Sequence, residues 1–207
     1  YLGSATSPFL PDLVLRYRRQ YPAVKVSVAE MTPTEQMKAF ERDAIDVGFT
    51  RPVERHQRQK FHELRIYEDR LMLALPAGDD RAKLGVIELQ DLAGEPVVLF
   101  ERSLAPGLID MAVGACQKAG FSPQIIGETP LMQTVLVMVA SGMGASIVPG
   151  CVSHLGIRGV KLVDFTPKAG AVDLRMVWAK LHTRPTVVAF ETLVKGQCAE
   201  IRKRMAN

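Results

Sequence analysis

The amino-acid sequence predicts an α/β fold built from two successive αβ units. Apolar residues recur with helical spacing in some segments, and they alternate or run continuously in others. Segments of the two kinds follow one another along the chain, which is typical of parallel sheets covered by helices. With 207 residues, 47% of them hydrophobic and 23% charged, the chain can form one large domain or two small lobes.

The first unit opens on the end of a strand at its first residues, and a helix, a strand, a helix and a strand follow in order. An amphipathic helix from residue 10 is expected to end at Tyr21 and Pro22, and alternating valines predict a strand at 24–28. Thr32 and the proline after it are typical of a helix start, and residues 46–49 form the next strand. We expect these strands to pair in parallel.

The second unit repeats this pattern after a continuous apolar run at 70–75, which is typical of a buried strand. The expected elements are a strand at 97–100, a helix from 107 that ends at Gly120, a strand at 124–126, a helix capped by Thr129 and Pro130, and a strand at 145–149. A last amphipathic helix is expected at 185–205.

No linker rich in Pro, Gly or Ser separates the units, so the chain is expected to cross between two lobes through strands, near 70–75 and again near 173–179. The predicted lobe I is residues 1–71 and 173–207, and lobe II is 72–172. Because the chain opens within a strand and has no initial methionine, we expect it to be a domain of a longer protein.

Composition excludes several classes of protein. The apolar runs are too short to span a bilayer, and three dispersed cysteines are expected to be reduced and buried in a cytoplasmic protein. The net charge is +4, and its basic clusters are interpreted as solvated helix faces and loops. A direct nucleic-acid groove is disfavoured because aromatic residues do not interleave with these charges.

Enzyme chemistry finds no support in the sequence. It contains no GxSxG elbow, Walker loop or metal-binding histidine pair, so we expect no catalysis, no metal and no cofactor. The stretch Ser141-Gly142-Met143-Gly144 resembles a phosphate loop, but it precedes a strand instead of following one. A helix C-cap followed by a tight turn explains it better.

Three expected helix starts are rich in small or hydroxylated residues: 3–6, 32–34 and 103–107. Helix starts expose unpaired backbone N–H groups, and their dipole favours anions. In open α/β sheets ligands bind beyond the carboxyl ends of strands, where helices begin. The sequence therefore predicts a site for a small carboxylate, although the hydroxyls at 4, 32 and 34 could also be simple helix caps.

Four motifs in order resemble the effector-binding domain of LysR-type transcriptional regulators across essentially the whole chain. They are Leu10-Pro11 with Tyr21-Pro22-x-Val24, Ile45-Asp46-Val47-Gly48-Phe49, Asp69-Arg70-Leu71-Met72-Leu73-Ala74, and Val139 to Pro149. The segments 30–36 and 48–51 resemble the subgroup that controls aromatic catabolism and responds to muconate, chlorinated muconates or benzoate. The resemblance implies a periplasmic-binding-protein type 2-like fold, with two Rossmann-like lobes joined by two crossover strands and the inducer between them.

The resemblance also implies ligand-binding residues. Ser4 matches a direct inducer contact, and Ala5 is a candidate at the same helix start. A second contact falls at 32–34, where Pro33 replaces a hydroxyl that Thr32 or Thr34 could supply. In lobe II, Gly107 and Leu108 stand where muconate regulators carry a polar residue and an aromatic ring. The remaining candidates are Arg102 as a counter-ion or a solvated cation, Ser103 in the same loop, Phe49 and Phe100 as stacking rings or core edges, and Pro149 at the end of the fourth motif.

The expected function is inducer sensing in a bacterial transcription regulator, with a small carboxylate, aromatic or from ring cleavage, switching transcription. By resemblance, the partners are a second copy in a homodimer or homotetramer and promoter DNA, which is bound through an N-terminal winged helix-turn-helix domain absent from this chain. Candidate dimer contacts are residues 21–28 and 107–118. A periplasmic solute-binding protein of a transport system is the alternative, and an upstream signal peptide would favour it.

Overall fold

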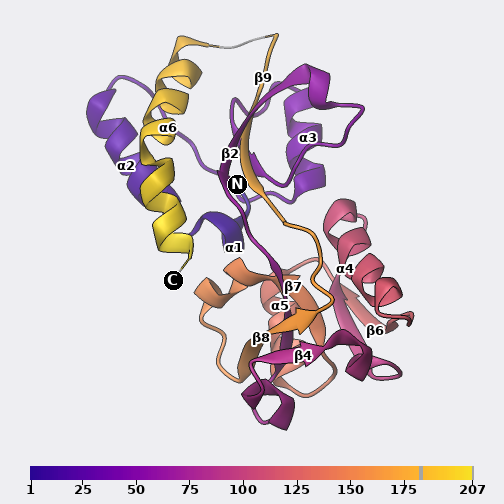
Figure 1. Ribbon diagram of the computed structural model, residues 1–207. Helices are drawn as coiled ribbons and strands as arrows, with labels where there is room; N and C mark the ends of the chain where they lie inside the picture. Colours follow the sequence, from indigo (N-terminus) through magenta and orange to yellow (C-terminus); the bar gives the residue numbers. More distant parts are fainter. Residues whose placement is uncertain (182–183, 207) are drawn as a thin grey trace. The chain divides into compact units, whose positions relative to one another are not determined.

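The computed structural model describes residues 1–181 and 184–206. The chain divides into two compact units: unit 1 comprises Tyr1–Glu68 and Asp173–Asn207, and unit 2 comprises Asp69–Val172. The backbone therefore passes from one unit to the other twice, after Glu68 and after Val172. Figure 1 traces this path from the indigo N-terminus to the yellow C-terminal helix.

Unit 1 combines the two ends of the chain. Its elements are α1 (Gly3–Thr6), α2 (Leu10–Gln20), α3 (Pro33–Glu41), β1 (Gly48–Thr50), the 3-10 turn η1 (Arg58–Lys60), β2 (Phe61–Tyr67), β9 (Leu174–Ala179) and α6 (Pro185–Met205). The helices expected at 10–20 and 185–205 are confirmed, and α2 ends just before Tyr21 and Pro22. Both begin with proline in their first turn, where a missing N–H costs nothing.

The sheet of unit 1 has the order β1-β9-β2, and both pairs are antiparallel. The expected parallel pairing of strands at 24–28 and 46–49 was wrong, because β1 pairs with β9 in the antiparallel direction and residues 24–28 form no strand. The chain re-enters unit 1 through β9, which inserts between β1 and β2 and runs against both. Pattern analysis of residues 1–50 could not anticipate a strand contributed from residue 174 onward.

Helices cover both faces of this sheet. Figure 1 shows α2 and α6 side by side, with α3 on the other side of β2 and β9. The Tyr17 ring meets the Phe190 ring edge-on at 5.1 Å, and the Tyr17 hydroxyl donates to the Thr186 carbonyl at 2.8 Å. On the α3 side, the apolar cluster consists of Phe40, Val53, Phe61 and Val177.

Residues 24–28 do not form a strand in the structure, so this expectation was also wrong. The valines alternate as predicted, but a strand exists only where a neighbouring backbone supplies hydrogen bonds. Residues 25–28 make no backbone hydrogen bond within the described part of the chain. Bonds to a neighbouring backbone occur only beyond them, where the Tyr1 amino group donates to the Ala29 carbonyl and the Met31 N–H donates to the Tyr1 carbonyl.

Unit 2 contains the middle of the chain. Its elements are β3 (Leu71–Pro76), η2 (Asp80–Lys83), β4 (Val86–Glu88), η3 (Leu89–Leu92), β5 (Pro96–Phe100), α4 (Pro106–Lys118), β6 (Gln124–Thr129), α5 (Met132–Ala140), β7 (Ser146–Pro149), η4 (Gly150–Leu155) and β8 (Val160–Thr166). The predicted strands at 70–75, 97–100, 124–126 and 145–149 are all present, within a few residues of the expected ends.

The strands of unit 2 form one sheet in the order β4-β8-β3-β7, and a parallel pair, β5-β6, adjoins it. A parallel bridge between Val97 and Ala145 places β5 beside β7. The strands β5, β6 and β7 therefore run in the same direction, and their carboxyl ends at Phe100, Thr129 and Pro149 share one edge. This is the edge at which open α/β sheets bind ligands.

Two expectations about helix ends have opposite outcomes. Thr129 does not cap α5, because it belongs to β6, opposite Phe100, and its carbonyl accepts the Glu101 N–H; Leu131 is the N-cap instead. The interpretation of residues 141–144 is confirmed, since Ser141 is the C-cap of α5 and Gly142 follows at φ +74°. The three cysteines are buried, as predicted.

Candidate functional site

The helix starts of unit 1 converge because hydrogen bonds join the segments that precede them. The Leu2 N–H donates to the Phe49 carbonyl at 3.2 Å, which brings the start of α1 to β1. The Met31 N–H donates to the Tyr1 carbonyl at 3.0 Å, which brings the start of α3 to the same place. We call this place the unit 1 corner; it consists of Leu2, Ser4, Met31, Thr32 and Phe49.

The unit 1 corner is held by Gln36, a residue that the sequence analysis missed. Gln36 is fully buried, and its side-chain amide donates to the Met31 carbonyl at 3.1 Å and to the Phe49 carbonyl at 3.0 Å. The sequence does indicate that Gln36 is buried, because it lies one helical turn before Phe40 and therefore on the same, inward face of α3. A polar residue on an inward face is the informative kind of exception.

Ser4 is the second residue of α1, and Leu2, without a side-chain hydrogen bond, is the N-cap. The interpretation of Ser4 as a helix cap is therefore wrong. Ser4 is half-buried, and within the described chain its hydroxyl has no hydrogen-bond partner. A hydroxyl in this state can donate to a carboxylate without first breaking an internal bond.

The backbone N–H groups of α1 differ in whether they are free to donate to a ligand. The Ala5 and Thr6 N–H groups both donate to the Leu2 carbonyl, at 3.2 and 3.1 Å, and the buried Ala5 carbonyl accepts the Tyr67 hydroxyl at 2.9 Å. The Gly3 and Ser4 N–H groups make no backbone hydrogen bond in the described residues. Any backbone contact with a ligand at α1 must therefore come from Gly3 and Ser4, one step earlier than Ala5.

A carboxylate of the protein itself already lies beside this helix start. A Cβ added to Gly3 would lie 2.3 Å from Glu30 Oε1, so the exposed Glu30 side chain rests against the Gly3 backbone. Only glycine fits at position 3 while Glu30 holds this position. The negative charge of Glu30 also opposes a second anion at the same helix start.

Thr32 and Thr34 have different roles at the start of α3. Thr32 is the N-cap of a capping box: its hydroxyl accepts the Glu35 N–H at 3.3 Å, and its own N–H donates to Glu35 Oε2 at 2.7 Å. These bonds, the one from the Thr32 N–H foremost, lower the pKa of Glu35. Thr34 lies in the first turn and is half-buried. The capping interpretation is confirmed for Thr32.

Phe49 is a core residue of unit 1. Only 4% of it is exposed, and its ring contacts Phe9 and Phe190 edge-on, at centroid distances of 6.1 and 6.3 Å. Its backbone carbonyl, not its ring, faces the corner through the bonds from Leu2 and Gln36.

In unit 2, the candidates gather at the shared carboxyl edge of β5, β6 and β7. Phe100 ends β5 half-buried and packs against the apolar clusters on both sides of the sheet. Pro149 ends β7 and is the N-cap of η4. Both residues therefore lie at the predicted edge, Phe100 partly accessible and Pro149 buried.

The loop after β5 carries two polar candidates, and each is engaged with a carboxylate. The exposed Arg102 guanidinium holds Asp110 through bonds of 2.7 and 3.1 Å, and these raise the pKa of Arg102. The Ser103 hydroxyl donates to the Glu101 carboxylate. A ligand carboxylate would have to compete with these internal partners.

Gly107 and Leu108 lie in the first turn of α4 and differ in exposure. Gly107 is exposed, and a Cβ added to it would meet no atom within 4 Å, so the space beside it is open. The Leu108 side chain is 8% exposed and belongs to the core of unit 2. The structure brings Phe100, Gly107 and Pro149 to one unit and Ser4, Thr32 and Thr34 to the other.

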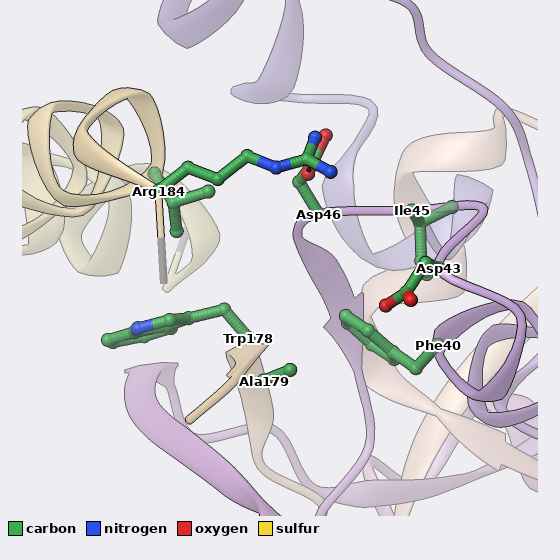
Figure 2. Close-up of a pocket in the computed structure, with 8 residues that line it drawn as sticks. Phe40, Asp43, Ile45, Asp46, Trp178, Ala179 and Arg184 are labelled. Atoms are coloured by element: carbon green, nitrogen blue, oxygen red, sulfur yellow. Dashed lines mark hydrogen bonds and ion pairs between the residues drawn. The ribbon is translucent and has the colours of Figure 1, made fainter. Parts of the chain in front are cut away.

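A separate small cavity lies at the other end of β1. Figure 2 shows Trp178, Phe40 and Asp43 around it, with the Arg184 guanidinium reaching Asp46, and the two ionised groups are 2.7 Å apart. Its volume of about 20 Å³ has room for about one water molecule, which excludes an aromatic acid.

No group of three or more His, Cys, Asp or Glu side chains in residues 1–181 and 184–206 is placed to hold a metal ion. Within the same ranges, no helix is both long enough and apolar enough to cross a membrane.

Comparison with known proteins identifies the family. The chain matches the LysR substrate binding domain over residues 2–199. The HTH-type transcriptional regulator AlsR of Bacillus subtilis (strain 168) is 30% identical over 155 residues, which are 75% of this chain and 51% of that protein. The chain thus spans about half the length of AlsR.

Solved structures show the same fold. The BenM effector binding domain with its effector benzoate has a TM-score of 0.80 at 21% identity, covering 96% of this chain and 90% of that one. The effector binding domain of QuiR in complex with shikimate also has a TM-score of 0.80, at 18% identity, covering 96% and 94%. These likenesses confirm the periplasmic-binding-protein type 2-like α/β fold with two lobes. The chain belongs to the LysR substrate binding domain family.

Proposed function

We propose that this chain is the effector-sensing domain of a LysR-type transcriptional regulator and that its effector is a small carboxylate, either an aromatic acid or a ring-cleavage product. The observation that carries the proposal is the Ser4 hydroxyl, half-buried and without a partner in the described chain, at the start of α1 beside the start of α3. Benzoate and shikimate, the ligands of the two similar structures, are both small carboxylates. The finer assignment to the aromatic-catabolism subgroup is part of the proposal.

Residues of both units contribute to the proposed binding. In unit 1, the Ser4 hydroxyl and the Gly3 and Ser4 N–H groups donate to the carboxylate, and Thr34 adds a hydroxyl. In unit 2, the Gly107 N–H, the Phe100 ring and Ser103 contact the rest of the effector. Five further candidates support these groups without contacting the effector, because each is buried or already hydrogen-bonded: Ala5, Thr32, Phe49, Leu108 and Pro149.

The role of Arg102 depends on its ion pair with Asp110. Its guanidinium binds the effector only after it leaves Asp110. The variant Asp110→Asn weakens that internal pair, so it strengthens effector binding if Arg102 is a counter-ion and leaves it unchanged if Arg102 is a solvated cation. Asp91→Asn, an exposed carboxylate in η3, is the matched control for the change in net charge.

The proposed mechanism is a population shift. An effector that binds one arrangement of the two lobes more tightly raises the population of that arrangement. In an assembly of two or four chains this changes the spacing of N-terminal winged helix-turn-helix domains on promoter DNA, and thereby transcription. We propose that the protein acts in the cytoplasm and that this chain has no catalytic activity and no cofactor. In this proposal lobe I is residues 1–71 and 173–207, and lobe II is residues 72–172.

Calorimetric titration of the wild type, Ser4→Ala and Ser4→Gly with benzoate and with muconate tests the assignment of Ser4. Loss of a hydrogen bond to a charged group weakens binding by about 1.5–3 kcal/mol, roughly ten- to a hundredfold in Kd. Because Ser4 is not a cap, Ser4→Ala leaves stability nearly unchanged, whereas Ser4→Gly lowers it slightly through backbone entropy. Unchanged affinity in both variants removes the Ser4 hydroxyl from the site.

A further inference from the structure

The chain enters and leaves unit 2 at two residues that a hydrogen bond holds together. Unit 2 begins at Asp69 and ends at Val172, and the Val172 N–H donates to the Asp69 backbone carbonyl at 2.8 Å. The two connections to unit 1 therefore leave unit 2 from one point. Changes in the arrangement of two lobes are absorbed by a few residues at the ends of elements, which is where these connections lie.

The side chain of Asp69 fastens this point to the end of β7. One carboxylate oxygen accepts the Arg70 N–H at 2.8 Å, and the other accepts the Cys151 N–H at 3.2 Å. The Arg70 carbonyl accepts the Gly150 N–H at 2.8 Å. Asp69 and Arg70 thus supply acceptors to the first two N–H groups of η4, the 3-10 helix that follows β7.

The start of η4 needs such acceptors from outside its own sequence. Its N-cap is Pro149, which makes no side-chain hydrogen bond, and the first N–H groups of a helix have no partner within it. Gly150 leaves room for the carboxylate, because a Cβ there would lie 3.0 Å from Asp69 Oδ1 and 3.3 Å from Met72 Sδ. The contact therefore depends on an aspartate at 69 and a glycine at 150.

The end of β7 belongs to the carboxyl edge that β5, β6 and β7 share at Phe100, Thr129 and Pro149, which we call the effector edge. We propose that Asp69 is a positioning residue: it fixes both connections against the effector edge and thereby limits the arrangements that the two lobes take before an effector binds. Fewer arrangements leave less conformational freedom to be lost on binding. The contribution to effector binding rests on the proposed function, whereas the limit on lobe arrangement does not.

Pulsed electron paramagnetic resonance measures the spread of lobe arrangements directly. Spin labels are attached to Lys38→Cys in α3 and Gln133→Cys in α5, two exposed positions in different units. Labelled protein is diluted with unlabelled protein, so that only distances within one chain are recorded. The three native cysteines are buried and are not expected to take up label.

Asp69→Ala removes the acceptor for the Cys151 N–H, so without ligand its distribution of label distances is expected to be broader than that of the wild type. Calorimetric titration with benzoate and with muconate is expected to give a Kd about three- to tenfold higher for the variant, because a smaller fraction of free molecules has the binding arrangement. Asp69→Asn keeps one acceptor oxygen, so both its width and its Kd are expected to fall between the two.

Asp79→Ala is the matched control. Asp79 also lies in unit 2 and caps a 3-10 helix, since its carboxylate accepts the Arg81 N–H at 2.9 Å at the start of η2. Loss of either cap is expected to lower the melting temperature. Only Asp69→Ala is expected to broaden the distance distribution, because η2 holds neither connection.

Gly150→Ala tests the same contact without changing Asp69. Its Cβ displaces the Asp69 carboxylate from η4, so its distance distribution is also expected to broaden. Unchanged widths in Asp69→Ala and Gly150→Ala would overturn the role of Asp69, whatever the acids do. Broader distributions with an unchanged Kd would overturn its contribution to effector binding. If the widths increase and no acid binds the wild type, the proposed function fails and the limit on lobe arrangement stands.

Discussion

The side-chain amide of Gln36 donates to the backbone carbonyl of Phe49 over 3.0 Å, and the same amide donates to the Met31 carbonyl over 3.1 Å. One buried side chain therefore fixes the start of α3 against β1. The Phe49 carbonyl also accepts the Leu2 N–H, so the position of α1 depends on the same arrangement. The candidate effector residues on both helices are thus positioned by Gln36 without contact between Gln36 and the ligand.

Replacing Gln36 by glutamate should be more damaging than its small change in shape suggests. A carboxylate oxygen in the place of the amide nitrogen would face two carbonyl oxygens in a buried site, so we expect a loss of at least about 3 kcal/mol in the free energy of unfolding. Gln36→Leu should cost about 1–3 kcal/mol, because it leaves two carbonyls with fewer donors. Urea denaturation measures both. The exposed Gln133→Glu is the control, and a Gln36→Glu variant as stable as this control would contradict the role of Gln36.

The capping box at α3 predicts a dependence on pH. The bonds from Thr32 lower the pKa of Glu35 below its ordinary 4.5, so the charged form stabilises the fold at pH values above 4.5, and this stabilisation is lost as pH falls through the lowered pKa. At pH 7, Glu35→Ala should cost about 0.5–1 kcal/mol. Thermal unfolding of both proteins from pH 7 downward should show the difference shrinking below pH 4.5. Glu41→Ala, at the other end of α3 and outside the capping box, is the control variant.

The glycine at 144 is required by a close approach of two backbones. A Cβ on residue 144 would lie 2.5 Å from the Pro96 carbonyl oxygen, which also accepts the Ala145 N–H at 3.0 Å. Gly144→Ala must therefore disturb the junction of β5 and β7, at a cost of about 1–3 kcal/mol. Gly114→Ala, in the middle of α4 with no atom within 4 Å of the new Cβ, should instead gain about 0.5–1 kcal/mol. Equal destabilisation of the two variants in urea would show that the contact with Pro96 is unimportant.

The carboxylate of Glu30 beside Gly3 predicts a gain in affinity on its removal. Glu30→Gln removes a negative charge from the start of α1, so benzoate should bind more tightly, by roughly the 0.2–1 kcal/mol typical of exposed charge pairs or up to about fivefold in Kd. Calorimetric titration at low salt measures the effect. Glu41→Gln makes the same change of net charge away from the site and should leave Kd unchanged. An equal gain in affinity in both variants would show that net charge, and not the position of Glu30, causes the effect.

Much of the fold was predictable because local pattern determined it. The helices at 10–20 and 185–205 carry sustained apolar faces between clear start and stop signals, and the buried strands of unit 2 are continuous apolar runs. The glycine after α5 was identifiable as a C-cap from its place between a helix and a strand. Such features depend on neighbours a few residues away.

The features that were missed depend on distant parts of the chain. The direction of the unit 1 sheet follows from β9, more than a hundred residues after β1. The valines at 24–28 alternate correctly, yet a strand needs a partner that sequence periodicity does not reveal. At the candidate site, the sequence identified the hydroxyls, but not that Thr32 is engaged with Glu35, that Arg102 is held by Asp110, or that Glu30 lies against Gly3.

The central claim is that this domain binds a small carboxylate through its charge. The most direct measurement compares the melting temperature of the domain with benzoate, muconate and chlorinated muconate against the corresponding neutral amides. The account predicts that at least one acid raises the melting temperature as its concentration increases, because ligand that binds only the folded state stabilises it, and that its amide does not. Equal shifts for an acid and its amide, or no shift with any acid of the panel at millimolar concentration, would contradict it.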